Sequence, residues 1–361
     1  MNILHVVGAR PNFMKAAPVL RALSVHPALR QTLIHTGQHY DAVMSDIFFQ
    51  QLEMPKPDCN LEVGSGTHAQ QTARIMLAIE PVLLERKPDL VLVYGDVNST
   101  VAAALVCSKL GIKVGHVEAG LRSRDRTMPE EINRLLTDQL SDLLFTPSPD
   151  GDENLVHEGI DSSKIHHVGN VMIDTLVRLL PRAEAQFPAD IPLPYALVTL
   201  HRPSNVDDLP WLKEMLSTLA ELSGRLHLIF PVHPRTRQRL DGVGLAASSN
   251  SRLRLMQPSP YLEFLALQQR AAMVITDSGG IQEETTFLGV PCLTIRENTE
   301  RPVTVTKGTN QLVGRDLQKL RGAADEILQR GSQARSPRSV PLWDGHASER
   351  IAQVIVRHLG P

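Results

Sequence analysis

The sequence predicts an α/β protein built of two doubly wound, Rossmann-like lobes. Short apolar runs alternate with helix-length amphipathic stretches along nearly the whole chain, which is the pattern of parallel βαβ units. A proline-rich stretch near the middle interrupts this alternation. The length of 361 residues exceeds one ordinary hydrophobic core and fits two domains. We therefore expect two parallel sheets, each covered by helices.

The first lobe is expected to span residues 1–170. Each of its apolar runs predicts a strand and precedes a helical pattern: ILHVV, TLIHTG, LVLVYGD, KVGHVEA, LLFTPS and IHHVGN. The second lobe, residues 171–345, repeats the plan with YALVTLH, LHLIFPVH, LRLMQP, AAMVITDS and PCLTIR. The boundary lies near FPADIPLP, because its prolines interrupt regular structure.

The end of the chain predicts a loop and then a helix. GSQARSPRS at 331–339 is typical of an exposed loop. SERIAQVIVRHLG then places Ile351, Val354, Ile355 and Leu359 on one helical face. We expect this helix, residues 346–361, to complete the first lobe.

Composition excludes several classes of partner. Lysine and arginine number 37 against 39 acidic residues, with no long run of one sign, so neither nucleic acid nor a membrane surface is an expected partner. Cys59, Cys107 and Cys292 lie far apart and form neither a disulfide framework nor a thiolate metal site. The chain starts without a basic leader, and no apolar run approaches the ~18 residues of a membrane span. The sequence predicts a cytoplasmic protein with a small-molecule partner and no metal.

Ligands of open α/β sheets bind beyond the carboxyl ends of the strands, and these positions are polar here. The first strand is followed by GARPNFMK, in which Gly8 permits a tight turn and Pro11 suits a first helical turn. Arg10 and Lys15 add positive charge, which predicts an anion site. The alternative is a glycine turn with solvated charges. Neither GxGxxG nor GxxxxGK[ST] occurs here, which disfavours ordinary dinucleotide binding.

VITDSGGIQEE at 274–284 predicts a diphosphate site, because a strand leads into a glycine turn and then a helix. The backbone amides of Ser278, Gly279 and Gly280 can cradle phosphate, and Glu283 or Glu284 can accept hydrogen bonds from ribose hydroxyls. The alternative is a plain N-cap at Asp277 or Ser278, which leaves the adjacent glycines unexplained. Nearby, Arg296, Glu300 and Arg301 either close over the phosphates or pair on the surface.

Three acidic residues at strand ends or a helix start predict proton transfer. Glu118 ends a strand and needs a cationic partner, for which Arg122, Arg124 and Arg134 are the candidates. Asp96 follows another strand and either faces the ligand or caps the next helix. Glu130 matches a capping box with Thr127, so its structural alternative is strong.

Two histidines end strands of the second lobe. His201 lies in TLHRPSN and His233 in FPVHPR, each followed by an arginine within two residues. Either histidine can transfer protons or bind phosphate, and either can be a satisfied buried imidazole. Zinc is a poor fit, because neither HExxH nor a Cys/His cluster is present.

Together these motifs resemble the bacterial and archaeal non-hydrolysing UDP-N-acetylglucosamine 2-epimerases. They run in family order over nearly the whole chain: GARPNFMK, HTGQHYD, GDVNST, HVEAGLRS, PEEINR, HVGN, TLHRPSN, DSGGIQEE and TERP. The resemblance implies a GT-B-like pair of Rossmann-type lobes with the active site in the cleft. It also implies interconversion of UDP-N-acetylglucosamine and UDP-N-acetylmannosamine by elimination and re-addition of UDP, without a cofactor, in a homodimer that serves polysaccharide biosynthesis.

The resemblance carries functional roles onto matching residues. Catalytic roles fall on Asp96, Glu118, Glu130 and His201. Substrate-binding roles fall on Arg10, Lys15, Arg134, His233, Ser278, Gly279, Gly280, Glu284 and Arg301. Gln38 and Arg74 match contacts of a second, activating substrate molecule. Ala9, Asn12 and Val303 depart from the family pattern, which loosens the substrate identity rather than the reaction type.

Four alternatives remain open at the level of sequence. The substrate can be a modified UDP-acetamido sugar, or the enzyme can hydrolyse its product to free N-acetylmannosamine. A GT-B-like glycosyltransferase would instead transfer the sugar to an acceptor. A nucleotide-sugar sensor would bind UDP without turnover.

Overall fold

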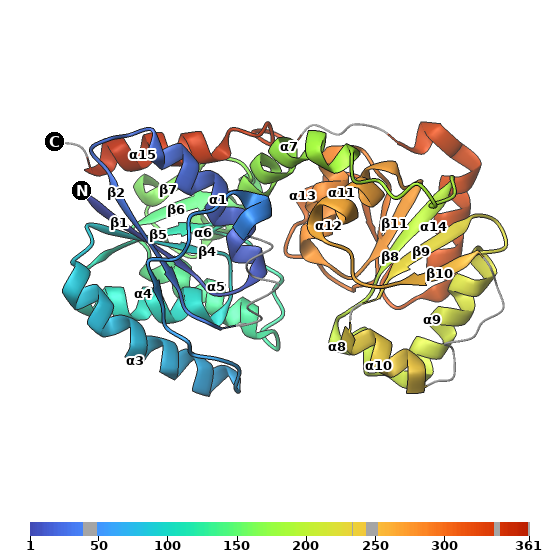
Figure 1. Ribbon diagram of the computed structural model, residues 1–361, viewed down its shortest axis with the longest axis horizontal. Helices are drawn as coiled ribbons and strands as arrows, with labels where there is room; N and C mark the ends of the chain where they lie inside the picture. Colours follow the sequence, from blue (N-terminus) through green and yellow to red (C-terminus); the bar gives the residue numbers. More distant parts are fainter. Residues whose placement is uncertain (39–48, 233, 243–251, 336–339, 360–361) are drawn as a thin grey trace. The chain divides into compact units, whose positions relative to one another are not determined.

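The computed structural model describes residues 1–38, 49–232, 234–242, 252–335 and 340–359. The chain divides into two compact units, drawn in Figure 1: the first comprises Met1–Arg178 and Pro341–Pro361, and the second Leu179–Val340. None of the described helices combines the length and apolar character needed to cross a lipid bilayer.

The first unit alternates strands and helices as the sequence predicts. Its strands are β1 (Asn2–Val7), β2 (Arg30–His35), β3 (Cys59–Asn60), β4 (Leu90–Tyr94), β5 (Lys113–Val117), β6 (Leu143–Thr146) and β7 (Ile165–His167). Its helices are α1 (Arg10–Ser24), α3 (His68–Arg86), α4 (Asn98–Leu110), α5 (Pro129–Leu140), α6 (Pro149–His157) and α15 (Ala347–Leu359), with a 3₁₀ turn at Ser162–Lys164. Helix α7 (Val171–Glu184) runs across the division between the units.

The second unit repeats this plan. Its strands are β8 (Tyr195–Thr199), β9 (His227–Pro231), β10 (Leu253–Met256), β11 (Met273–Thr276), β12 (Cys292–Thr294) and β13 (Asn310–Leu312). Its helices are α8 (Pro203–Val206), α9 (Leu209–Leu222), α10 (Pro234–Gly242), α11 (Tyr261–Arg270), α12 (Gly279–Leu288), α13 (Val303–Thr306) and α14 (Leu317–Arg330). A 3₁₀ turn at Gly331–Ala334 occupies part of the predicted loop.

Both sheets are parallel and doubly wound. Among the described residues, the first has the strand order β3-β2-β1-β4-β5-β6-β7 and the second β10-β9-β8-β11-β12-β13. In each sheet the chain builds one half outward from a central strand and then returns to build the other half. The pairs β1/β4 and β8/β11 are therefore the topological switch points, where ligands of such sheets bind. The predicted fold class is confirmed.

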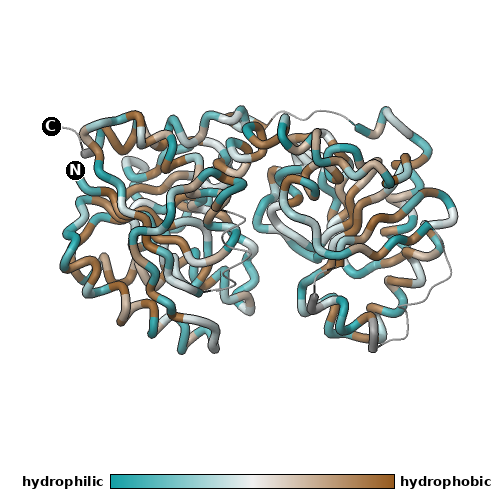
Figure 2. Tube along the Cα trace, in the orientation of Figure 1, coloured by the Kyte–Doolittle hydropathy of each residue, from teal (hydrophilic) through white to brown (hydrophobic). Residues whose placement is uncertain are grey.

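The central strands are buried on both faces, because helices cover each sheet on two sides. Every residue of β4 is buried, and apolar residues follow the middle of both sheets (Figure 2). In the second unit Leu212, Met215 and Leu219 of α9 belong to the same apolar cluster as Leu228 and Phe230 of β9. This packing holds the strand ends in fixed positions.

The C-terminal segment belongs to the first unit. Asp174 of α7 accepts hydrogen bonds from the amides of Ala347 (3.1 Å) and Ser348 (2.7 Å). The first amides of a helix have no intrahelical acceptor, so this carboxylate caps the start of α15. The indole of Trp343 donates to the carbonyl of Pro147 (2.8 Å). Ile351 and Ile355 are fully buried on the predicted apolar face of α15.

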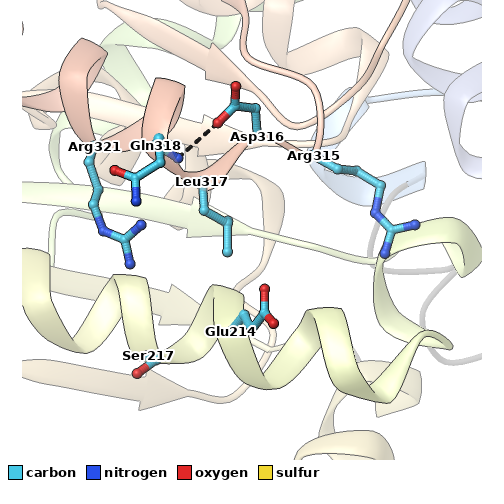
Figure 3. A pocket seen from close by; sticks show the side chains of 7 residues that line it. All are labelled: Glu214, Ser217, Arg315, Asp316, Leu317, Gln318 and Arg321. Carbon is cyan, nitrogen blue, oxygen red and sulfur yellow. Dashed lines mark hydrogen bonds between the residues drawn. The ribbon is translucent and has the colours of Figure 1, made fainter.

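A surface hollow of the second unit lies between α9 and α14 (Figure 3). Its lining consists of Glu214, Ser217, Arg315, Asp316, Leu317, Gln318 and Arg321, none of which is a predicted site residue. Its arginines are already paired, Arg315 with Asp208 (2.5 Å) and Arg321 with Glu221 (2.8 Å). Both guanidinium groups of the hollow therefore already have carboxylate partners within the second unit.

Candidate active site

The switch point of the first unit gathers several predicted residues. Lys15 lies on α1, directly after β1, and Asp96 follows β4. Gly95 makes this approach possible, because a Cβ atom there would lie 2.5 Å from the Lys15 Nζ and 3.1 Å from a Glu118 carboxylate oxygen. Its φ of 62° is also one that glycine adopts readily. Three strand ends thus converge around one glycine.

Glu118 forms a buried ion pair with Lys15. The sequence offers Arg122, Arg124 and Arg134 as candidate partners, whereas the ion pair described for Glu118 is with Lys15. Arg122 instead pairs with Asp138 (2.7 Å) and Glu158 (2.6 Å), while Arg124 contacts Asn154. The backbone of Glu118 has φ 76°, a conformation that residues other than glycine rarely adopt and that is often found at functional sites.

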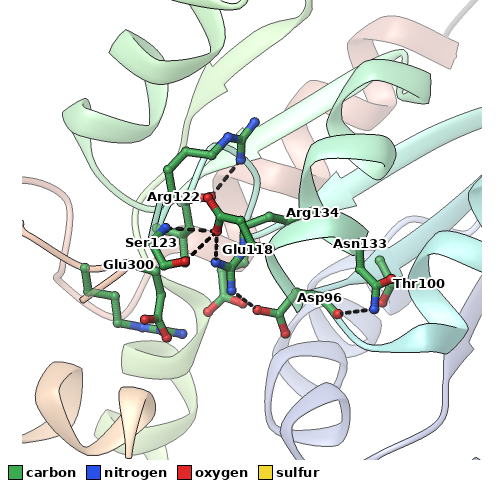
Figure 4. A network of polar contacts seen from close by, with 12 residues as sticks. Asp96, Thr100, Glu118, Arg122, Ser123, Asn133, Arg134 and Glu300 are labelled. Atoms are coloured by element: carbon green, nitrogen blue, oxygen red, sulfur yellow. Dashed lines mark hydrogen bonds and ion pairs between the residues drawn. The ribbon is translucent and has the colours of Figure 1, made fainter. Parts of the chain in front are cut away.

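Asp96 is ion-paired with Arg134 of α5 (Figure 4). Arg134 also pairs with Glu131 at 2.5 Å, and it is almost fully buried. The alternative that Asp96 caps the next helix is wrong, because the N-cap of α4 is Val97. At the start of α4, the side-chain oxygen of Gln38 instead accepts a hydrogen bond from the Ser99 amide (2.9 Å). The Asp96 carboxylate therefore does not cap a helix. Together with Glu118 it forms a pair of ion-paired carboxylates at neighbouring strand ends, which we call the acid cluster.

The start of α5 differs from the predicted capping box. The N-cap is Met128, and the Thr127 hydroxyl donates to Asp125 (2.6 Å). Pro129 occupies the first helical turn and Glu130 follows it, half-buried. The capping-box alternative for Glu130 is therefore wrong, and its catalytic role stays a prediction.

The neighbouring Glu131 is a structural carboxylate that sequence reasoning missed. It accepts from the amides of Ser123 and Arg124 and from the Ser123 hydroxyl, each at 2.9 Å. Burial acts to raise the pKa of Glu131, but these bonds and the Arg134 guanidinium hold it below its ordinary value. An ionised Glu131 thus fixes both the 123–124 loop and Arg134.

His116, Asp138 and Arg122 form a second buried network next to the glycine turn that precedes Asp96. His116 Nδ1 lies 2.6 Å from Asp138, and its Nε2 lies 2.8 Å from the Gly95 carbonyl. Burial acts to raise the pKa of Asp138, but His116 and Arg122 together keep it lowered. This network connects α5 to the glycine turn before Asp96.

The two residues predicted to contact an activating molecule lie in the first unit. Gln38 is buried, and its side-chain oxygen accepts from the Ser99 amide and hydroxyl. The Arg74 guanidinium donates to the carbonyls of Val63 (3.1 Å), Ser65 (3.4 Å) and Gln70 (3.3 Å). Both side chains thus have structural contacts here.

In the second unit, His201 is held by Asp277 at the β8/β11 switch point. Its Nδ1 lies 3.0 Å from the carboxylate, and its backbone amide donates to the same group. Asp277 also accepts from Arg202 and Asn205, and although burial acts to raise its pKa, these partners keep it below the ordinary value. The His201 side chain is 46% exposed, so its ring remains accessible.

The glycine turn after β11 leads directly into α12. Ser278 is the N-cap, and its side chain makes no capping hydrogen bond. A Cβ atom on Gly279 would lie 2.7 Å from Arg301 Nη1 and 2.8 Å from a Glu300 oxygen. Arg301 pairs with Glu283 (2.8 Å) and Glu300 (2.5 Å), so a buried guanidinium lies beside this turn. Gly280 follows within the first turn of α12.

Glu284 is buried one turn further along α12. It accepts from the Tyr261 hydroxyl (2.8 Å) and from Gln268 (2.9 Å). Burial raises the pKa of Glu284, and these two hydrogen bonds offset only part of the effect. Arg10 is exposed at the start of α1, and His233 lies outside the described residues. Within the part of the chain that the structure describes, no cluster of three His, Cys, Asp or Glu side chains could hold a metal ion.

Comparisons with known proteins extend this description. A family model for UDP-N-acetylglucosamine 2-epimerase matches residues 21–356. The UDP-N-acetylglucosamine 2-epimerase of Methanococcus maripaludis is 43% identical over 361 residues, covering 97% of both chains. The UDP-2,3-diacetamido-2,3-dideoxy-D-glucuronate 2-epimerase of Pseudomonas aeruginosa is also 43% identical, covering 99% of this chain and 100% of the relative.

A solved structure agrees with this similarity. The crystal structure of Methanocaldococcus jannaschii UDP-GlcNAc 2-epimerase in complex with UDP-GlcNAc and UDP has a TM-score of 0.91 and 44% identity. It is covered completely, and it covers 99% of this chain. The fold and the site define an α/β protein of two Rossmann-like units with ion-paired carboxylates at the strand ends of one unit. The chain belongs to the UDP-N-acetylglucosamine 2-epimerase family.

Proposed function

We propose that the protein catalyses the reversible epimerisation of UDP-N-acetylglucosamine to UDP-N-acetylmannosamine, as a non-hydrolysing enzyme. The observation that carries the proposal is the acid cluster at the first switch point. Asp96 and Glu118 follow adjacent strands, and each is held by its own buried cation. Similarity over nearly the full length to enzymes named for this reaction supports the substrate.

The chemistry explains the need for several acids. The C2 proton of the sugar is not adjacent to a carbonyl group, so its removal must be coupled to departure of a leaving group. A carboxylate takes the C2 proton, the C–H electrons form the C1=C2 double bond, and the C1–O bond breaks with its electrons going to UDP. Re-addition of UDP and protonation from the opposite face reverse each change. Asp96, Glu118 and Glu130 supply these acid and base groups in our proposal.

The remaining residues position the carboxylates, bind the nucleotide and stabilise the negative charge that develops on UDP as it leaves. Lys15 and Arg134 hold the two carboxylates in place. The amides of Ser278, Gly279 and Gly280 at the start of α12 bind the diphosphate, because a helix N-terminus favours negative charge. Arg10, His233 and Arg301 add positive charge, Glu284 accepts from the ribose, and His201 assists the leaving phosphate. This chemistry requires neither a metal nor a redox cofactor.

Four further features belong to the same proposal. The enzyme acts in the cytoplasm as a homodimer, and Gln38 and Arg74 contact an activating substrate molecule. The product enters polysaccharide biosynthesis. The cytoplasmic location rests on the composition of the chain, and the other statements rest on the family resemblance.

A modified UDP-acetamido sugar is the second candidate substrate. The Pseudomonas aeruginosa relative is named for such a sugar and is as similar to this chain as the Methanococcus maripaludis enzyme. Asn12 is one of the departures from the family motif, and its side chain accepts from Gly8 and Ala9 and donates to the Tyr94 carbonyl. The family resemblance alone therefore does not define the sugar.

The test is incubation with each UDP-sugar in deuterated water, followed by proton NMR. The proposal predicts deuterium at C2 of a UDP-linked gluco/manno mixture. Free N-acetylmannosamine with UDP would establish a hydrolysing enzyme. Exchange with only the diacetamido-glucuronate substrate would select the second candidate. A glycosyltransferase or a sensor would leave C2 unlabelled.

Gly279→Ala is expected to weaken UDP binding by about tenfold or more, or about 1.4 kcal/mol. The new methyl group would displace Arg301 and Glu300, which lie within 2.8 Å of its position. Their flexible ends can move, so the fold should survive. Gly322→Ala in α14 is the matched control, because nothing lies within 4 Å of that Cβ position. Calorimetric titration with UDP measures both variants, and equal affinities would exclude Gly279 from the diphosphate site.

A further inference from the structure

Two consecutive residues of α5 hold Asp96 at both of its ends. Arg134 pairs with the carboxylate, and the Asn133 side-chain amide donates to the Asp96 backbone carbonyl at 2.9 Å (Figure 4). Asn133 is 9% exposed, so little water competes for this hydrogen bond. The carboxylate and the turn that carries it are thus fixed from one helix.

Asn133 is itself the end of a chain of buried side-chain amides. Its Nδ2 lies 3.2 Å from Asn98 Oδ1, and Asn98 Nδ2 donates to Gln71 Oε1 at 2.8 Å. Gln71 Nε2 then donates to the carbonyls of Gln38 (2.9 Å) and Gly64 (3.0 Å). His68 Nδ1 lies beside Asn98 as well, 3.2 Å from its Nδ2. The chain connects α5, α4 and α3 of the first unit.

The two ends of this chain determine its direction. Backbone carbonyls lie at both ends, and a carbonyl only accepts hydrogen bonds. Asn133 and Gln71 must therefore turn their NH₂ groups toward Asp96 and Gln38. Asn98 fits between them in one orientation, with its oxygen toward Asn133 and its NH₂ group toward Gln71. A reversed Asn98 would place two donors and two acceptors face to face.

We infer that Asn133, oriented by Asn98 and Gln71, is a positioning residue that holds the Asp96 turn in its reactive geometry. The inference rests on the proposed epimerase function. Catalytic groups must lie within a fraction of an ångström of their productive positions, and a shift of about 1 Å can lower a rate about 10²-fold. Loss of the Asn133 bond should therefore lower kcat by about 10–100-fold. UDP affinity should not change, because the proposed UDP contacts of the second unit are untouched.

Asn133→Asp is the first variant, because it keeps the shape and removes both amide donors. Asn154→Asp is its matched control: Asn154 also donates to a backbone carbonyl at 2.9 Å, that of Gly120, and the substitution adds the same charge. Asn98→Asp disturbs the chain one step further from Asp96. Steady-state assays with the substrate found active, titration with UDP and thermal unfolding are measured for each variant.

The inference expects lower kcat for Asn133→Asp and Asn98→Asp, unchanged UDP affinity, and near-normal activity of Asn154→Asp. The double variant Asn98→Asp/Asn133→Asp should lose no more kcat than Asn133→Asp alone, because both substitutions break the same chain of hydrogen bonds. Unchanged kcat in Asn133→Asp, additive losses, or an equal loss in Asn154→Asp would overturn it. If the wild-type protein exchanges no C2 proton with either substrate, the proposed function fails and the inference fails with it.

Discussion

Glu118→Gln is expected to lower kcat for epimerisation by about 10²–10⁴-fold, the usual contribution of a general acid or base. A glutamine can still accept a hydrogen bond from Lys15, but it cannot take or deliver the C2 proton. Glu118 is buried and lies beside the glycine turn that precedes Asp96. The rate of deuterium exchange at C2 measures the loss directly.

The control for this substitution is Glu158→Gln. Glu158 is also a carboxylate in an ion pair, with Arg122 at 2.6 Å, but it has no place in the proposed chemistry. Glu158→Gln should therefore retain nearly full activity, and both variants should bind UDP as the wild type does. Normal C2 exchange in Glu118→Gln would remove this residue from the mechanism.

Much of the site was predictable because ligands of open α/β sheets bind beyond the carboxyl ends of the strands. Apolar runs marked the strands, so the residues after β1, β4, β5, β8 and β11 were known to share one edge of each sheet. The ion-pair partners of the acidic residues were not predictable in the same way. Lys15 is 103 residues from Glu118 in sequence, and it reaches Glu118 only because β1 and β5 flank β4. The arginines nearer to Glu118 in sequence were the more obvious candidates.

Helix starts and buried amides were harder to interpret. Thr127 and Glu130 had the residue types and spacing of a capping box, but α5 begins after Met128 and the local bond of Thr127 is to Asp125. Asn98 and Asn133 were assigned no role from the sequence, because burial of a side-chain amide has no signature in a single sequence. The short strands β3 and β13 also escaped prediction, because their residues, CN and NQL, include no apolar run.

Lys15→Met is expected to destabilise the first unit by about 3–5 kcal/mol, because it removes a cation that is paired with the buried Glu118 carboxylate. The side chains of Lys15 and Glu118 are only 6% and 4% exposed, so water cannot replace the lost partner. Urea unfolding in a Trp211→Phe background measures this change. Trp343 is then the remaining tryptophan, and it lies in the first unit.

The double variant Lys15→Met/Glu118→Met separates the buried charge from lost packing. It should regain most of the lost stability, since two apolar side chains of similar length leave no charge to solvate. It should also remain inactive, because the proposed base is absent. If the destabilisations of the two single substitutions simply add, the ion pair contributes no coupling and Lys15 acts through packing alone. Recovered stability without recovered activity would instead mean that the unpaired carboxylate causes the loss in Lys15→Met, and that activity requires this pair more than the fold does.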